Sequence, residues 1–118
     1  MSLAEARNER VVFITCPTRA LARQIARAVV QMRVAACVNL VHSPIESLYR
    51  WKGKVERARE YLLVMKTTSK RLAELENEVK RLHSYDVPEF IALPITEGSE
   101  KYLSWLTDSV KRAPKNRK

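Results

Sequence analysis

The feature that most constrains the fold of this chain is an unusually long pair of strand-like segments. Residues 35–67 have the pattern of two strands that fold about a turn near Lys52-Gly53-Lys54. Together the strands span roughly 30 residues, whereas an average strand has about 5 to 6. A hairpin of this length extends beyond any core that a chain of 118 residues can build. The extension needs a surface to pack against, so the sequence first predicts an assembly.

The two ends of this hairpin differ in polarity. Around Lys66 the second strand is apolar on both faces, whereas charged side chains dominate the half that follows Val55. The half near Lys66 is therefore predicted to be buried in the domain, and the distal half is predicted to project. Pro44 interrupts the first strand and predicts a bulge or kink there.

A buried strand and a helix are predicted ahead of the hairpin. Residues 10–16 form an apolar, β-branched run that ends at Pro17, and Thr18 can cap the helix that follows. The inward residues of this helix are Leu21, Ile25, Ala28, Val29 and Met32. Its solvated face carries Arg19, Arg23 and Arg27.

Two helices and one strand are predicted after the hairpin. Thr68 or Ser69 can cap the first of these helices. Its inward residues are Leu72, Leu75, Val79 and Leu82, and its solvated residues are Glu74, Glu76, Glu78, Lys80 and Arg81. Residues 88–95 predict the strand, and Gly98-Ser99 opens the last helix. The inward residues of that helix are Tyr102, Leu103, Leu106 and Val110.

The order of these elements is β-α-β-β-α-β, followed by a C-terminal helix. Two crossover connections put both long helices on one face of a four-stranded antiparallel sheet. The predicted fold class is therefore α+β, a ferredoxin-like sandwich with an extended hairpin. The other sheet face has to be covered by the last helix, by another subunit or by a ligand.

Composition is that of one ordinary globular domain. The hydrophobic fraction is 46%, and we divide the chain into an N-terminal arm (1–9), one domain (10–110) and a basic tail (111–118). Apolar runs are too short to span a membrane, and the acidic start of the chain is unlike a signal peptide. We therefore expect a cytoplasmic protein.

The net charge of +9 is concentrated at the end of the chain. Residues 111–118 hold five of the 22 basic residues and no acidic residue, so the rest of the chain carries only +4. The tail is predicted to be a disordered, solvated arm. A nucleic-acid partner is disfavoured, because such a surface needs shape and stacking aromatic side chains as well as charge.

Catalytic and metal-binding motifs are scarce. With only two glycines the chain has no phosphate-binding loop, and it has no HExxH motif or nucleophile elbow. A Cys16–His83 nucleophile–base pair is conceivable, but the sequence does not bring the two residues together. Cys16, Cys37, His42 and His83 are the soft or borderline metal ligands, without the spacing of a structural zinc site. The simplest interpretation of the two cysteines is that both are reduced core thiols.

A third group of polar residues lies where the third strand, the second helix and the fourth strand meet. It contains Lys66, His83, Tyr85 and Glu89. A carboxylate at the head of a core strand needs a partner, and Lys66 or an arginine is the expected partner of Glu89. Two interpretations stay open: an ion pair that fixes a corner of the fold, or a small-ion site between subunits.

Trp51 is predicted at the tip of the projecting hairpin. An exposed Trp on such a tip is costly unless it docks on another surface. We favour docking on a neighbouring subunit over stacking on a ligand, because Trp is a frequent interface anchor.

Six ordered blocks of the sequence resemble the CutA divalent-cation-tolerance family. They are residues 35–39, 47–54, 62–67, 83–89, 93–95 and 102–105, and the resemblance covers roughly residues 10–110. It implies a ferredoxin-like domain in a tight homotrimer, similar in shape to the PII signalling proteins, whose long hairpins pack between subunits. Tyr49, Trp51 and Trp105 are then expected at the trimer interface.

The resemblance also implies weak binding of copper or other divalent cations, at a site that is not required for folding, and no enzymatic activity. His83 matches the histidine of the family's metal proposals well, and Cys16 matches the cysteine loosely. This chain has Leu82 where some members have a second histidine, and Ser84 replaces the usual proline.

These expectations lead to two hypotheses of function. In the first, a non-enzymatic, cytoplasmic homotrimer binds copper at Cys16 and His83 and acts in the tolerance of metal ions. In the second, a PII-like sensor binds a small anion in an inter-subunit cleft formed by Lys66, Tyr85 and Glu89.

Overall fold

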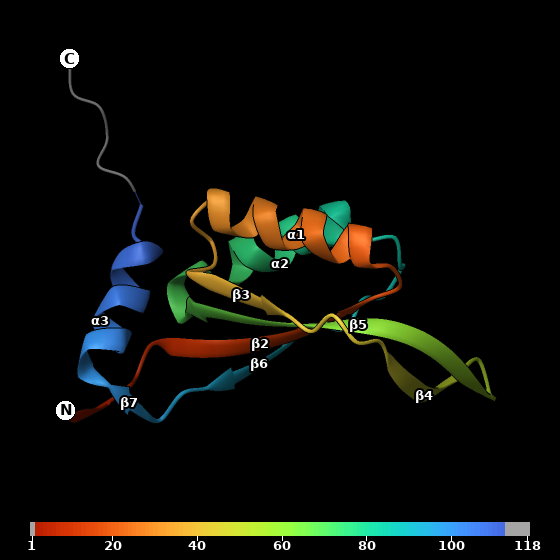
Figure 1. Cartoon of the computed structure of the whole chain (residues 1–118), viewed down its shortest axis with the longest axis horizontal. Helices are drawn as coiled ribbons and strands as arrows, with labels where there is room; N and C mark the ends of the chain where they lie inside the picture. Colours follow the sequence, from red (N-terminus) through yellow and green to blue (C-terminus); the bar gives the residue numbers. More distant parts are fainter. Residues whose placement is uncertain (1, 113–118) are drawn as a thin grey trace, which may run out of the picture.

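A twisted antiparallel sheet runs through the molecule, and helices α1 (Arg19–Gln31) and α2 (Leu72–Leu82) lie together on one of its faces (Figure 1). The computed structural model describes residues 2–112. The central strands, in the order β3-β5-β2-β6, are β3 (Cys37–Leu40), β5 (Lys54–Thr68), β2 (Glu9–Cys16) and β6 (Ile91–Pro94). Each neighbouring pair is antiparallel. The predicted ferredoxin-like α+β fold is confirmed.

Helix α1 forms where the sequence predicts it. The Thr18 side chain accepts a hydrogen bond from the backbone N–H of Leu21 at 3.1 Å, which satisfies one of the free donors at the start of the helix. Ile25 and Val29 are fully buried against the sheet. Met32 was predicted to point inward, but it lies just after the helix and is half exposed.

The start of α2 differs from the prediction. A 3₁₀ turn, η1 (Ser69–Arg71), precedes the helix, and neither Thr68 nor Arg71 makes a side-chain cap. Glu78 was expected on the solvated face but is buried, and both of its carboxylate oxygens accept hydrogen bonds from Arg81 at 2.9 and 2.6 Å. The paired guanidinium supplies the charge that this buried carboxylate needs.

The core lies between the sheet and the two helices. In β2 the fully buried side chains alternate with less buried ones, as expected for a strand with one face toward the helices. The main cluster of buried residues contains Val12, Ile14, Cys16, Ala22, Ile25, Val29, Val34, Ala35, Leu63, Met65, Leu75 and Val79.

The long hairpin is confirmed and has a bulge in its first half. The first strand is divided into β3 and β4 (Ile45–Trp51), and both pair with β5. Leu40 pairs with Leu63, and Ile45 pairs with Glu60. Between these two pairs the first strand advances by five residues and β5 by only three, so the first strand contains extra residues. The extra residues lie around Pro44, as predicted from the missing donor of proline.

A two-residue turn closes the hairpin at its tip. Lys52 and Gly53 have φ angles of 51° and 79° between the paired residues Trp51 and Lys54. Positive φ at both positions is the signature of a type I′ turn, which suits the right-handed twist of the strands. The hairpin tip projects from one end of the molecule (Figure 1).

Helix α3 (Glu100–Ser109) lies at the opposite end of the sheet from the hairpin tip (Figure 1). It begins after Ser99, whose side chain accepts a hydrogen bond from the N–H of Tyr102 at 3.4 Å. Leu106 and Val110 are buried in a second cluster with Ala36. Tyr102 was predicted to point inward but is 42% exposed.

A small two-stranded sheet supports the start of α3. Strand β1 (Leu3–Glu5), which the sequence did not predict, pairs with β7 (Glu97–Ser99). The fourth strand is also shorter than predicted, because only Ile91–Pro94 of residues 88–95 pair with β2.

The sheet face away from the two helices is apolar and partly exposed. Phe13 pairs with Ile91 and Val11 pairs with Leu93, so these four side chains lie on the same face, which we call the open sheet face. Ile91 is 50% exposed and Leu93 is 42% exposed. Within residues 2–112, no α-helix is long and apolar enough to cross a membrane.

The start of the basic tail makes ion pairs. Lys111 contacts Asp108 at 3.0 Å, and Arg112 contacts Glu74 of α2 at 2.9 Å. The rest of the predicted arm, residues 113–118, lies outside the described residues.

Candidate functional site

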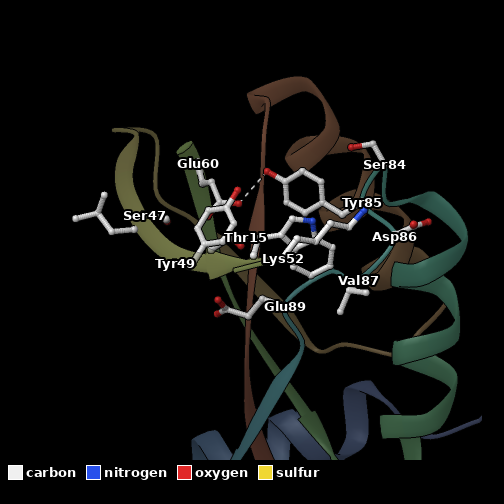
Figure 2. A pocket seen from close by; sticks show the side chains of 12 residues that line it. Thr15, Ser47, Tyr49, Lys52, Glu60, Ser84, Tyr85, Asp86, Val87 and Glu89 are labelled. Atoms are coloured by element: carbon white, nitrogen blue, oxygen red, sulfur yellow. Dashed lines mark hydrogen bonds between the residues drawn. The ribbon is translucent and has the colours of Figure 1, made fainter. Parts of the chain in front are cut away.

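A cleft of about 800 Å³ lies between the projecting hairpin, including its tip, and the loop that joins α2 to β6 (Figure 2). We call it the hairpin cleft. Its lining residues are Thr15, Ser47, Leu48, Tyr49, Trp51, Lys52, Glu60, Ser84, Tyr85, Asp86, Val87 and Glu89. A cleft of this size matches those that hold small molecules.

Glu60 and Tyr85 are joined across the hairpin cleft (Figure 2). The Tyr85 hydroxyl donates a hydrogen bond to Glu60 Oε2 at 2.9 Å, and Glu60 is only 7% exposed. Burial and this hydrogen bond raise the pKa of Tyr85. Burial, and secondarily the charge of Glu60, raise the pKa of Glu89. The site is therefore a negatively charged cleft with a neutral phenol in its wall.

His83 lies beside the cleft with both ring nitrogens occupied. Nδ1 accepts a hydrogen bond from the backbone N–H of Tyr85 at 3.1 Å, so the ring proton lies on Nε2, which donates to the carbonyl oxygen of Thr15 at 2.7 Å. His83 is 8% exposed, and its ring centroid lies 4.8 Å from that of Tyr85. In this arrangement the imidazole therefore has no free lone pair with which to ligate a metal ion.

Cys16 does not form a nucleophile–base pair with His83. The Cys16 thiol is fully buried, and burial, followed by the charge of Glu60, raises its pKa to about 12. A thiol with this pKa stays protonated and is a poor nucleophile and a poor metal ligand. Its protonated state and the occupied ring of His83 do not fit a copper site in this arrangement. In residues 2–112 no three His, Cys, Asp or Glu side chains lie close enough to hold a metal ion.

Lys66 was predicted beside Tyr85 and Glu89, and the structure places it elsewhere. Its ammonium donates hydrogen bonds to the Asn39 side chain and, at 3.6 Å, to Cys37 Sγ. Lys66 is six residues from Glu60 along β5, a separation of about 20 Å. Within one chain Lys66 therefore does not reach the cleft that Tyr85 and Glu89 line, and the inter-subunit cleft of these three residues stays a prediction.

The other two candidate metal ligands also lie apart. Cys37 was expected in the core, but it is half-buried on the open sheet face beside Lys66. His42 is exposed in the segment between β3 and β4, where its backbone carbonyl accepts a hydrogen bond from Arg19 at 3.3 Å. The four candidate metal ligands, Cys16, Cys37, His42 and His83, therefore do not form one site within a single chain.

The three residues expected at a trimer interface are all exposed aromatic side chains. Tyr49 and Trp51 are each 45% exposed on the hairpin, where they also line the cleft. Trp105 is 47% exposed on α3, with its ring 5.3 Å from that of Tyr102.

The sequence did not point to Glu60 as a site residue, although a signal was present. Glu60 shares one face of β5 with the apolar residues Leu62 and Val64, and a carboxylate that continues an apolar face is unusual. What the sequence could not show is that Tyr85, 25 positions later, covers this carboxylate.

The sequence matches the family model described as CutA1 divalent ion tolerance protein over residues 10–109. It is 50% identical over 101 residues to the divalent-cation tolerance protein CutA of Thermus thermophilus. This match spans 86% of this chain and 97% of the relative. It is 48% identical over 101 residues to human protein CutA, and there the match spans 83% of this chain and 56% of the relative.

Solved structures give the same result. The divalent cation tolerance protein of Thermus thermophilus superimposes with a TM-score of 0.85 at 48% identity, over 87% of this chain and 99% of the other. CutA1 of Oryza sativa superimposes with a TM-score of 0.86 at 42% identity, over 93% of this chain and all of the other. The family model, the relatives and the shared fold agree, and the chain belongs to the CutA1 divalent ion tolerance family.

Proposed function

We propose that this chain acts in the tolerance of divalent cations as a cytoplasmic homotrimer without catalytic activity. Membership of the CutA1 family carries this proposal, since the relative from Thermus thermophilus is named as a divalent-cation tolerance protein. The chemistry of the candidate site is consistent with a binding protein, because Cys16 and His83 lack the activated state that a nucleophile–base pair needs.

The proposal of a trimer is supported by two exposed features. The open sheet face leaves Ile91 and Leu93 about half exposed, and the projecting hairpin exposes Leu48, Trp51 and Val55. Large apolar side chains that are exposed in this way are typical of protein interfaces. A second and third copy of the chain would bury it.

Assembly can be tested by native mass measurement. We expect a species of three times the chain mass of 13.6 kDa. Replacement Trp51→Ala should weaken assembly or lower the melting temperature, because Trp is a frequent interface anchor. Unchanged mass and melting of this variant would show that Trp51 is not an anchor.

We propose copper as the metal and expect its binding to be weak. Thiol and imidazole groups are ligands that copper favours, but Cys16 and His83, the pair suggested by the family resemblance, do not fit a copper site in the arrangement that the structure shows. Binding at this pair requires His83 to release Thr15 and Tyr85, which opposes the affinity. Calorimetric titration of copper into the wild type and His83→Ala tests the assignment, and equal affinities would remove His83 from it.

The role in tolerance needs a test in cells. A strain that lacks the gene for this chain should grow less well than its parent in elevated copper, and the gene should restore growth. Equal growth of the two strains across a series of divalent metals would contradict the proposed function, whatever the purified protein binds.

The anion-sensing alternative needs Lys66 to face Tyr85 and Glu89 across a subunit interface. Within one chain Lys66 contacts Cys37 and Asn39. The cleft that Tyr85 and Glu89 do line carries three carboxylates and one lysine. An anion would therefore meet net repulsion there.

A further inference from the structure

Helix α1 and its C-terminal end carry the positive excess of the folded domain. Residues 19–33 contain four arginines and no acidic residue, whereas the rest of residues 1–110 holds 13 basic and 13 acidic residues. The surplus charge outside the basic tail is therefore concentrated on one short segment. A local excess of one sign attracts partners of the opposite sign.

Three of these arginines form a row along the exposed side of α1. They are four residues apart, a step of about 6 Å along the helix axis, and an exposed valine continues the row. Residues with this spacing lie within roughly 80° of the helix circumference. We call this surface the arginine row, and its members are Arg19, Arg23, Arg27 and Val30.

The described part of the chain does not neutralise the row. None of the ion pairs within residues 2–112 involves its three arginines. The neighbouring helix α2 differs, because Lys80 pairs with Glu76 at 3.3 Å and Arg81 pairs with Glu78 at 2.6 Å. Both helices lie on the same face of the sheet (Figure 1), so the imbalance belongs to α1 alone and not to the whole helical layer.

The charges of the row are unfavourable for the helix itself. Arg19 and Arg23, and then Arg23 and Arg27, are like charges at i, i+4 spacing, which repel each other. Arg19 also lies at the positive end of the helix dipole, and the first turn contains no acidic residue. A local rule that is broken without a gain inside the chain is typical of a functional surface.

One guanidinium of the row is held in position. Arg19 Nη2 donates a hydrogen bond to the carbonyl oxygen of His42 at 3.3 Å, and the guanidinium carbon lies 5.4 Å from the centre of the Tyr61 ring. These contacts restrict the side chain but leave its charge without a carboxylate. Arg19 therefore loses less conformational freedom on binding than an unrestrained surface arginine.

The surroundings of the row favour an acidic helix over other anionic partners. Helix α1 has no aromatic side chain on which bases could stack, and its apolar side is buried against the sheet, so it cannot enter a bilayer. Carboxylates four residues apart on a helix repeat at the same step of about 6 Å as the arginines. Val30, which is 41% exposed, offers an apolar contact at the end of the row.

We propose that the arginine row binds an acidic α-helical segment of a partner protein. Carboxylates at positions i, i+4 and i+8 of that segment face the three arginines, and an apolar residue lies against Val30. Each guanidinium can hold a carboxylate through two parallel hydrogen bonds. Because α1 covers the sheet face opposite the open sheet face, binding leaves the surfaces of the proposed trimer free (Figure 1). The inference is independent of the role in cation tolerance.

Three matched peptides test the chemistry of the partner. Each is an alanine-based helix of about 20 residues with a neutral dye, long enough to be helical in water. The first carries Glu at i, i+4 and i+8 and Leu at i+11, the second has Gln in place of Glu, and the third spreads the same Glu residues around the helix. Fluorescence anisotropy with the full chain should show saturable binding of the first peptide, which weakens as salt is raised. The third should bind at least tenfold more weakly, and the second should not bind.

Two double variants test the location. Arg23→Gln combined with Arg27→Gln should weaken binding of the first peptide by about tenfold, because it removes two exposed ion pairs. Arg7→Gln combined with Lys101→Gln is the control, since it removes the same charge at exposed positions outside α1 that make no ion pair within residues 2–112. The control should bind like the wild type. Both double variants should fold normally by circular dichroism, because all four side chains are exposed.

Three results would overturn the proposal. The first is that the Glu peptide does not bind to the folded chain even at low salt. The second is that the peptide with spread charges binds equally well, or that both double variants weaken binding equally, because net charge alone would then explain it. The third is that a duplex RNA or vesicles of phosphatidylserine bind through Arg23 and Arg27 while the Glu peptide does not, which would assign the row to another class of polyanion.

Discussion

The Nε2 atom of His83 lies 2.7 Å from the carbonyl oxygen of Thr15, and this hydrogen bond ties the end of α2 to the end of β2. The N–H of Tyr85 occupies the other ring nitrogen at 3.1 Å. The residue that the family resemblance suggests as a metal ligand is thus a clamp in this structure. It also holds the loop that carries Tyr85 and Glu89 into the hairpin cleft.

Removal of this clamp should destabilise the protein. We expect His83→Ala to lower the free energy of unfolding by about 2 kcal/mol, because the buried carbonyl of Thr15 loses its donor. Urea denaturation followed by circular dichroism measures the change. Ser84→Ala, at the exposed neighbouring position, is the control and should stay within about 0.5 kcal/mol of the wild type.

Cys16 should resist alkylation over a wide pH range. Its pKa is raised to about 12 by burial and by Glu60, so the thiol stays protonated in the folded protein where an ordinary cysteine is already a thiolate. Iodoacetamide labelling at pH 9, read by peptide mass spectrometry, should leave Cys16 unmodified until guanidinium unfolds the chain. Rapid labelling of the folded protein would contradict this.

The sign of the corresponding stability change follows from the same shift. A raised pKa means that the folded state binds the Cys16 proton more tightly than the unfolded state does. The resulting stabilisation is complete below the ordinary thiol pKa and is lost as the pH rises toward about 12. Replacement Cys16→Ala should remove this component of alkaline unfolding.

Charge on the open sheet face should prevent assembly. We expect Ile91→Glu to convert the proposed trimer to monomer, because Ile91 is half exposed on an apolar face opposite Phe13. Light scattering gives the mass. The matched control is Val30→Glu, since Val30 is 41% exposed on α1, which covers the other face of the sheet, and this variant should stay assembled.

Two substitutions in the hairpin turn should change the stability of the protein differently. Gly53 has a φ of 79° with open space around its Cα, so Gly53→Ala should cost about 1 kcal/mol of stability through backbone strain alone. Lys52→Asn should be neutral or stabilising, because Asn tolerates the φ of 51° better than Lys. Thermal unfolding of both variants checks the pair, and equal losses would contradict the turn type.

Much of the fold was predictable because its signals are local. The cap at Thr18, the interruption at Pro44 and the turn at Lys52-Gly53 each depend on the chemistry of one or two residues, and each is confirmed. The unpredicted strand β1 shows the limit. Leu3–Glu5 form a strand only because Glu97–Ser99 present a free edge almost a hundred residues later.

The candidate site was predicted only in part, since its geometry depends on distant segments. Tyr85 and Glu89 were expected in a cleft between subunits, and they line a cleft within one chain together with Glu60, which the sequence did not indicate. Lys66 lies about 20 Å from Glu60 along β5. The extended strand is the reason, because it moves each successive side chain by a fixed step and so separates residues that are only six positions apart in the sequence.

The sequence by itself determined the α+β architecture, the long hairpin and the family, since periodicity, turn chemistry and ordered motifs are properties of neighbouring residues. Only the tertiary structure decided the state of the functional groups. Whether His83 is a free ligand or a clamp, and whether Glu60 is exposed or buried beneath Tyr85, depends on contacts between residues 68 and 25 positions apart. Desolvation and hydrogen bonding across such separations set the charge of the hairpin cleft, and no local pattern encodes them.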